Sequence, residues 1–135
     1  MGVVAMHFLV VEDDFFCRSI LVNILNEHGR CDVAVNGSEA SLAFASSLEQ
    51  GTSYDVVFLD IMLPDKDGQT LLKEFRAAEK EHGVRAGMGV PIIMTTALDD
   101  RGNILQAFSS QCEGYIVKPV DEDKVAEKLR ELRKI

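Results

Sequence analysis

The chain has 135 residues, 47% of them hydrophobic, which is enough for one globular domain with a single core. Fourteen basic side chains against 22 acidic ones give a net charge of −8 at pH 7, which opposes binding to nucleic acid or to an anionic membrane. We therefore expect a single domain over residues 1–135, with proteins or cations as partners.

The cysteines and the N-terminus indicate the compartment. Cys17, Cys31 and Cys112 are widely spaced and form no Cys-x-x-Cys pair, so they predict neither a disulfide framework nor a zinc site and favour a reducing cytoplasm. The N-terminal stretch MGVVAMHFLVVEDD reaches acidic residues too early for a signal peptide or a membrane span. The start at Met1 and the charged end at Ile135 favour a free-standing protein over an excised domain.

Short β-rich runs alternate along the chain with segments whose apolar side chains recur every three or four residues. The runs, which predict strands, are Phe8–Val11, Asp32–Val35, Val56–Leu59, Ile92–Met94 and Tyr115–Val117. The apolar positions that predict amphipathic helices are Cys17, Ile20, Leu21 and Ile24; Ala40, Ala43, Phe44 and Leu48; Leu71, Phe75 and Ala78; Ile104, Leu105 and Phe108; and Val125, Leu129 and Leu132.

Residues that commonly cap helix N-termini stand before each of these helical segments. They are Asp14, Asn36 with Glu39 three residues on, Asp67, Asp99 or Asp100, and Asp121. The strict alternation of strand and helix, with strands that are apolar throughout, predicts an α/β fold in which helices cover both faces of a parallel sheet. The connection His82–Val90 contains three glycines and predicts a long surface loop.

Ligands of open parallel sheets bind beyond the carboxyl ends of the strands, so the residues that follow each apolar run are candidate site residues. Glu12, Asp13 and Asp14 follow the first run, Asn36 and Gly37 the second, Asp60 the third, Thr95, Thr96 and Ala97 the fourth, and Lys118 and Pro119 the fifth. Four of the five ends carry complementary polar groups.

Glu12, Asp13 and Asp60 would crowd their negative charges together, and Lys118 offsets only one of the three. A divalent cation would neutralise the remainder, and hard carboxylate oxygens with room for water suit Mg²⁺. Asp60, at the end of a central strand, would then be a nucleophile toward a phosphoryl group, assisted by the metal, by Lys118 and by the Thr96 hydroxyl.

Five motifs, FLVVEDD, VNGSEA, DVVFLDIMLPDKDG, VPIIMTTA and GYIVKPV, occur in this order from Phe8 to about Leu132. On these motifs the sequence resembles the receiver domain of two-component response regulators, and is similar to the single-domain chemotaxis regulator. The resemblance implies a doubly wound, flavodoxin-like (βα)5 sheet in the order 2-1-3-4-5, a signalling domain rather than an enzyme, and a cis peptide between Lys118 and Pro119.

The resemblance also implies roles for individual residues. Asp60 would accept the phosphoryl group of a phosphohistidine from a sensor histidine kinase or a phosphotransfer protein. Glu12 and Asp13 would hold Mg²⁺ together with Asp60 and the Met62 carbonyl, while Thr96 and Lys118 would contact the phosphoryl oxygens. Tyr115 would rotate after the Thr96 hydroxyl moves inward, and would thereby remodel the face through which an unknown downstream protein binds.

Other interpretations of the function of these residues stay open. The same fold could be a phosphorylation-independent adaptor, which would need neither Lys118 nor Thr96. A Mg²⁺-dependent phosphohydrolase also uses an aspartate after a strand, but its usual second acid is replaced here by Met62. A flavodoxin-like FMN carrier is disfavoured because acidic strand ends repel phosphate. Asp65 and Asp67 are interpreted as loop and helix-cap residues, because an EF-hand loop would need an acid at Leu63.

Overall fold

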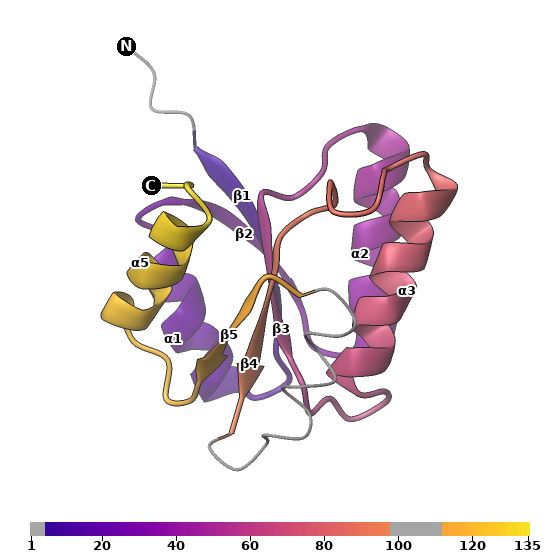
Figure 1. Ribbon diagram of the computed structural model, residues 1–135. Helices are drawn as coiled ribbons and strands as arrows, with labels where there is room; N and C mark the ends of the chain where they lie inside the picture. The colour runs from indigo at the N-terminus through magenta and orange to yellow at the C-terminus, as the bar shows by residue number, and fades with distance from the viewer. Residues whose placement is uncertain (1–4, 98–111) are drawn as a thin grey trace.

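The computed structural model describes residues 5–97 and 112–135, and its strands form one parallel sheet in the order β2-β1-β3-β4-β5 (Figure 1). The strands are β1 (Met6–Val11), β2 (Gly29–Ala34), β3 (Val56–Asp60), β4 (Ile92–Thr96) and β5 (Gly114–Val117). The expected α/β class and strand order are thereby confirmed. The central strand β3 is buried along its whole length, and it ends at Asp60.

The described helices are α1 (Phe15–Leu25), α2 (Gly37–Gln50), α3 (Gly68–Glu81) and α5 (Glu122–Glu131). All four begin at a predicted cap, whose side chain accepts a backbone N–H: Asp14 from Cys17, Asn36 from Glu39, Asp67 from Thr70 and Asp121 from Lys124. The predicted helix with Ile104, Leu105 and Phe108, and its cap at Asp99 or Asp100, lie outside the described residues.

The helices cover the two faces of the sheet in pairs, with α2 and α3 on one face and α1 and α5 on the other (Figure 1). Between α2 and α3, the rings of Phe44 and Phe75 stack with their centroids 4.2 Å apart. Leu25 of α1 and Leu129 of α5 are fully buried against the opposite face. Because both faces are covered, the positions open to a ligand are at the strand ends.

The strand β2 differs from its prediction. It runs from Gly29 to Ala34, not from Asp32 to Val35, and its residues Arg30, Asp32 and Val33 are exposed. The physical reason is its place at the edge of the sheet, where it pairs only with β1 and is less covered than the central strands. Gly29 suits this pairing, since a Cβ there would collide with the Met6 carbonyl.

The connections carry two further predicted features. The peptide between Lys118 and Pro119 is cis, as expected. The long connection predicted at His82–Val90 joins α3 to β4, between Glu81 and Ile92. No helix in the described part of the chain has the length and apolar character needed to cross a membrane.

Candidate functional site

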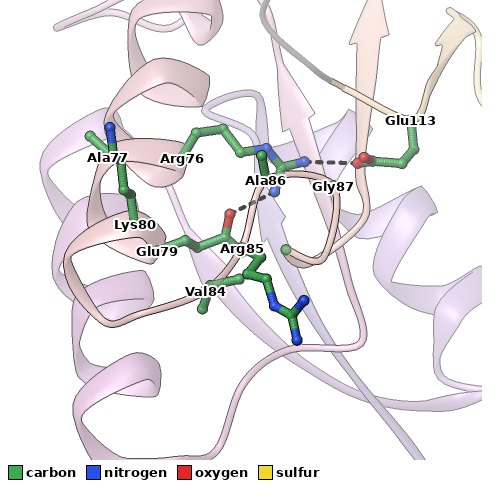
Figure 2. A pocket seen from close by; sticks show the side chains of 10 residues that line it. Arg76, Ala77, Glu79, Lys80, Val84, Arg85, Ala86, Gly87 and Glu113 are labelled. Atoms are coloured by element: carbon green, nitrogen blue, oxygen red, sulfur yellow. Dashed lines mark hydrogen bonds and ion pairs between the residues drawn. The ribbon is translucent and has the colours of Figure 1, made fainter.

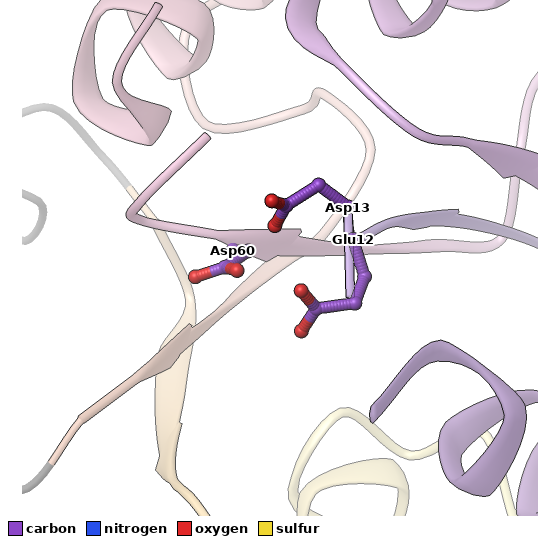
Figure 3. Close-up of side chains that lie close together, drawn as sticks. All are labelled: Glu12, Asp13 and Asp60. Carbon is purple, nitrogen blue, oxygen red and sulfur yellow. The ribbon is translucent and has the colours of Figure 1, made fainter. Parts of the chain in front are cut away.

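The carboxyl ends of β1 and β3 bring three acids together. Glu12 and Asp13 follow β1, and Asp60 is the last residue of β3, so the parallel pairing of the two strands places all three at one edge of the sheet. Their carboxylates gather around a common point (Figure 3), and one oxygen of each lies within 4.8 Å of the others. The predicted convergence of these acids is therefore observed.

Lys118, which follows β5, bridges two of the acids. Its Nζ lies 2.7 Å from Glu12 Oε1 and 3.2 Å from Asp60 Oδ2. Glu12 and Asp60 are each only 4% exposed, whereas Asp13 is open to solvent. The lysine thus neutralises one negative charge inside a poorly solvated pair of carboxylates.

The pKa values of the bridged groups reflect this environment. Burial raises the pKa of Glu12, and the hydrogen bond and charge of Asp60 raise it further, while Lys118 opposes both effects. Burial by itself would lower the pKa of Lys118, but its hydrogen bond to Glu12 and the charges of both carboxylates outweigh burial and raise it. Lys118 is therefore held in its charged form.

The Asp60 carboxylate is fixed at both oxygens. The backbone N–H of Met62 donates to Oδ1 at 3.0 Å, and Lys118 donates to Oδ2 at 3.2 Å. The Met62 side chain itself is 64% exposed. Two donors on opposite oxygens leave the carboxylate little rotational freedom, which is the condition for a nucleophile that must meet its substrate in one orientation.

Thr96 and Tyr115 lie on the neighbouring strands. Thr96, the last residue of β4, is fully buried; its Oγ1 donates to the Ala97 carbonyl at 3.1 Å, and its own carbonyl accepts from the Lys118 N–H at 2.7 Å. Tyr115 on β5 is partly buried against the core under α2 and α3, with Lys128 Nζ 6.0 Å from its ring centroid. The predicted roles of Thr96 at the phosphoryl oxygens, of the Met62 carbonyl and of Tyr115 as a switch stay predictions.

The donor set fits Mg²⁺. Three carboxylates and one ammonium leave a formal charge of −2. Their oxygens are hard ligands, and each has a second lone pair that can bind a cation while the first accepts a hydrogen bond from Lys118 or Met62. The exposure of Asp13 leaves room for the water molecules that Mg²⁺ usually keeps. Glu12, Asp13 and Asp60 are accordingly the residues that could hold this cation.

Exposed apolar side chains follow the acids of β1 along the chain. Phe15 and Phe16, at the start of α1, are 73% and 71% exposed. Beside them a cavity of about 100 Å³ opens between α1 and the residues after β5, and its wall includes Phe16, Pro119 and Val120 together with Glu12. Exposed aromatic residues beside a charged centre are typical of a protein contact surface.

Asp65 makes contacts that the sequence did not indicate. Its carboxylate accepts hydrogen bonds from the backbone N–H groups of Gly37 and Ser38, at 2.7 and 3.0 Å, and from the Ser38 hydroxyl at 3.1 Å. The interpretation of Asp65 as a plain loop residue is therefore incomplete, because it fastens the connection after β3 to the start of α2. No local pattern links these positions, which are 27 and 28 residues apart.

A second charged cluster lies at the opposite end of the sheet, before β4. Arg76 of α3 pairs with Glu79 and with Glu113, each at 2.8 Å (Figure 2), and also donates to the Val90 carbonyl at 2.8 Å. A hollow of about 740 Å³ adjoins it under the connection from α3 to β4. Because these side chains bind one another and the backbone of that connection, the cluster stabilises the fold and is not the candidate site.

Comparison with known proteins identifies the family of this chain. The family model for the response regulator receiver domain matches residues 8–130. The chain belongs to this family. The resemblance predicted from the five motifs is thereby confirmed, and the adaptor and phosphohydrolase interpretations are not favoured.

Individual relatives of this receiver domain agree with the family match. The transcriptional regulatory protein ResD of Bacillus subtilis is 35% identical over 125 residues, which are 92% of this chain and 46% of ResD. A chain in the co-crystal structure of the Saccharomyces cerevisiae histidine phosphotransfer signaling protein Ypd1 and the receiver domain of its downstream response regulator Ssk1 is 28% identical, with a TM-score of 0.80 over 95% of this chain and 88% of that chain.

A further solved structure, the CheX-CheY-BeF3-Mg²⁺ complex of Borrelia burgdorferi, contains a chain that is 26% identical, with a TM-score of 0.79 over 95% of this chain and 89% of that one. The receiver domain spans less than half the length of the curated relatives VanRB and ResD. The family match over residues 8–130 includes the carboxyl ends of all five strands.

Proposed function

We propose that this receiver domain accepts a phosphoryl group on Asp60 in two-component signalling. The observation that carries the proposal is the Asp60 carboxylate at the end of β3, held by the Met62 N–H and Lys118 beside Glu12 and Asp13. An Asp60 oxygen attacks the phosphorus of a phosphohistidine, the P–O bond forms as the P–N bond breaks, and the imidazole recovers the electron pair. Water later hydrolyses the acyl phosphate.

Each neighbouring residue has a part in this reaction. Bound Mg²⁺, held by Glu12, Asp13, Asp60 and the Met62 carbonyl, would neutralise the charge on the phosphoryl oxygens. Lys118 stays charged and pairs with a phosphoryl oxygen once Asp60 has reacted, and the Thr96 hydroxyl donates to another. The domain catalyses only its own phosphorylation and dephosphorylation, so it is a signalling component rather than an enzyme with a separate substrate.

The donor that fits the site is a protein. Phe15 and Phe16 present exposed aromatic surface next to the acids, and a small phosphodonor would leave that surface in water. A sensor histidine kinase or a histidine phosphotransfer protein would cover it, and the Ypd1–Ssk1 structure shows that a similar chain is crystallised with such a protein. The net charge of −8 argues against nucleic acid as a direct partner.

The output is a change in protein binding. Phosphorylation would draw the Thr96 hydroxyl toward Asp60, and Tyr115, two strands away from Asp60, would follow and alter the face offered to a downstream protein. The three cysteines are free, and their thiols fit a reducing compartment, which supports a cytoplasmic location.

The test is phosphate incorporation from a small phosphodonor in the presence of Mg²⁺. Wild type should take up one acid-labile phosphate per chain, and Asp60→Asn should take up none. Asp123→Asn is a matched control, because it makes the same chemical change at an exposed position in α5 and should behave as wild type. Lack of incorporation by wild type, or incorporation by Asp60→Asn at the wild-type level, would contradict the proposal.

A further inference from the structure

The connection between β3 and α3, residues 61–67, which we call the β3–α3 loop, carries the amide that orients Asp60. Its second residue, Met62, donates its N–H to Asp60 Oδ1 at 3.0 Å. Its two ends are joined by a hydrogen bond of 2.7 Å from the Gly68 N–H to the Ile61 carbonyl. Position 68 must be glycine for this closure, because a Cβ there would lie 2.5 Å from the Asp60 carbonyl oxygen.

The far side of the β3–α3 loop is fastened to α2 by Asp65. The carboxylate accepts from the Gly37 and Ser38 N–H groups, while Asn36 accepts from the Glu39 N–H, so each of these three amides in the first turn of α2 has an acceptor. A carboxylate at this position is also favoured by the helix dipole. The hydrogen bond from Gly37 is the largest cause that lowers the pKa of Asp65 to about 2, so Asp65 is ionised at neutral pH.

Lys66 makes two further contacts from the same loop, one with α2 and one with α3. Its methylene stem crosses Gly37 so closely that a Cβ on Gly37 would lie 2.4 Å from Lys66 Cγ. Its Nζ pairs with Glu74 of α3 at 3.0 Å. The loop is thus held at its tip by Asp65 and along its side by Lys66, and only the first of these contacts uses backbone amides of α2.

We propose that Asp65 is a positioning residue for Asp60: by fastening the β3–α3 loop to α2, it holds the Met62 N–H against one oxygen of the Asp60 carboxylate. The other oxygen then faces Lys118. The contribution of Asp65 to phosphoryl transfer rests on the proposed function, whereas its coupling to the Met62 amide does not.

The same contacts keep Asp65 away from the cation. The acids whose oxygens converge within 4.8 Å in the described part of the chain are Glu12, Asp13 and Asp60, and Asp65 is not among them. Its charge is directed to the N-terminus of α2 instead. Asp65 therefore influences the site through the path of the backbone and not as a ligand.

The test compares Asp65→Ala with Glu74→Ala, a control that removes an acid of the same charge and breaks the Lys66 contact to the same loop. The first readout is amide hydrogen exchange in the metal-free proteins. In Asp65→Ala the Met62 amide should exchange about tenfold faster, while the Val57 amide near the start of β3 should keep its rate. Glu74→Ala should leave both rates within about twofold of wild type.

The second readout is phosphorylation by a small phosphodonor at saturating Mg²⁺. Asp65→Ala should react about tenfold more slowly than wild type and Glu74→Ala, because a misoriented carboxylate meets the phosphorus less often. Asp65→Asn keeps one acceptor oxygen for Gly37 and should recover part of the rate. It also replaces Asp65→Ala in both measurements if that variant does not fold.

An unchanged Met62 exchange rate in the Asp65 variants would overturn the proposed coupling. Faster exchange with a wild-type phosphorylation rate would overturn the positioning role while leaving the contact itself intact. If wild type itself takes up no phosphate, the proposed function fails, and the exchange measurement still decides whether Asp65 holds the Met62 amide.

Discussion

Replacing Lys118 with Met should have opposite effects on phosphorylation and on metal binding. The substitution keeps an unbranched apolar stem but removes the ammonium group, which lies 2.7 Å from Glu12 and 3.2 Å from Asp60. The three carboxylates would then carry a formal charge of −3 in place of −2. Phosphorylation should be lost, because the ammonium that would pair with a phosphoryl oxygen is absent. Mg²⁺ should bind more tightly, because a positive charge that competes with the metal has been removed.

The effect of Lys118→Met on the free energy of unfolding follows from how deeply Lys118 and its carboxylate partners are buried. Removing one partner of a buried ion pair costs about 3–5 kcal/mol. The Lys118 side chain is 25% exposed, while those of Glu12 and Asp60 are 6% exposed, so the lower end of that range, about 3 kcal/mol, applies without metal. If Mg²⁺ binds the variant about tenfold more tightly, saturating Mg²⁺ reduces the difference by about 1.4 kcal/mol.

Three measurements check this reasoning on one variant. Urea unfolding with and without Mg²⁺ gives the two stability differences, calorimetric titration gives the two Mg²⁺ dissociation constants, and phosphate incorporation gives the reaction. Saturating Mg²⁺ changes the difference in unfolding free energy between wild type and Lys118→Met. That change must equal RT times the logarithm of the ratio of the two Mg²⁺ dissociation constants. Weaker Mg²⁺ binding by Lys118→Met would refute the account of Lys118 as a charge that competes with the metal.

The remaining predictions concern the fold and the loop. Arg76→Met should lower the free energy of unfolding, measured in urea, by about 3 kcal/mol, because it removes the cation that pairs with the 4%-exposed Glu79 carboxylate. A loss under about 1 kcal/mol would contradict this prediction. Phe44→Ala should cost about 3–5 kcal/mol in the same assay, against almost none for the exposed Leu42→Ala, and equal losses would contradict the packing argument. The stabilisation that ionised Asp65 contributes is complete above its unfolded pKa of about 3.8 and is lost as pH falls through about 2. The difference in unfolding free energy between wild type and Asp65→Asn should therefore be constant from about pH 7 to 5 and should decrease below about pH 4. A difference in unfolding free energy that increases in acid would contradict the lowered pKa of Asp65.

Much of the fold could be predicted because its signals are local. Each helix has a cap directly before it whose side chain accepts the backbone N–H three residues ahead, within the reach of one side chain; the caps are Asp14, Asn36, Asp67 and Asp121. The central strands are continuously apolar because both of their faces are covered. The limits of β2 were wrong because an edge strand has no such requirement, so its exposed residues carry little pattern.

The candidate site was predictable in part for a related reason. Parallel strands end at one edge of the sheet, so Glu12, Asp13, Asp60 and Lys118 could be expected to converge from their position after apolar runs alone. The part of the Thr96 hydroxyl in phosphoryl transfer was inferred from its place after an apolar run, whereas the roles of Met62 and Tyr115 came with the resemblance, and all three are still to be tested. Asp65 is a loop residue as predicted, but its contacts could not be predicted, because its partners lie at the distant start of α2 and two of them are backbone amides, which leave no trace in the side-chain sequence.

The sequence by itself determined the order of strands and helices, the helix starts and the acids and lysine at the strand ends, since each follows from neighbouring residues or from apolar periodicity. Only the tertiary structure decided which oxygen of Asp60 meets Met62 and which meets Lys118, that Asp65 binds α2, and that Arg76 joins Glu79 to Glu113. These contacts connect positions far apart in the chain, and their geometry exists only once the helices have packed on the sheet.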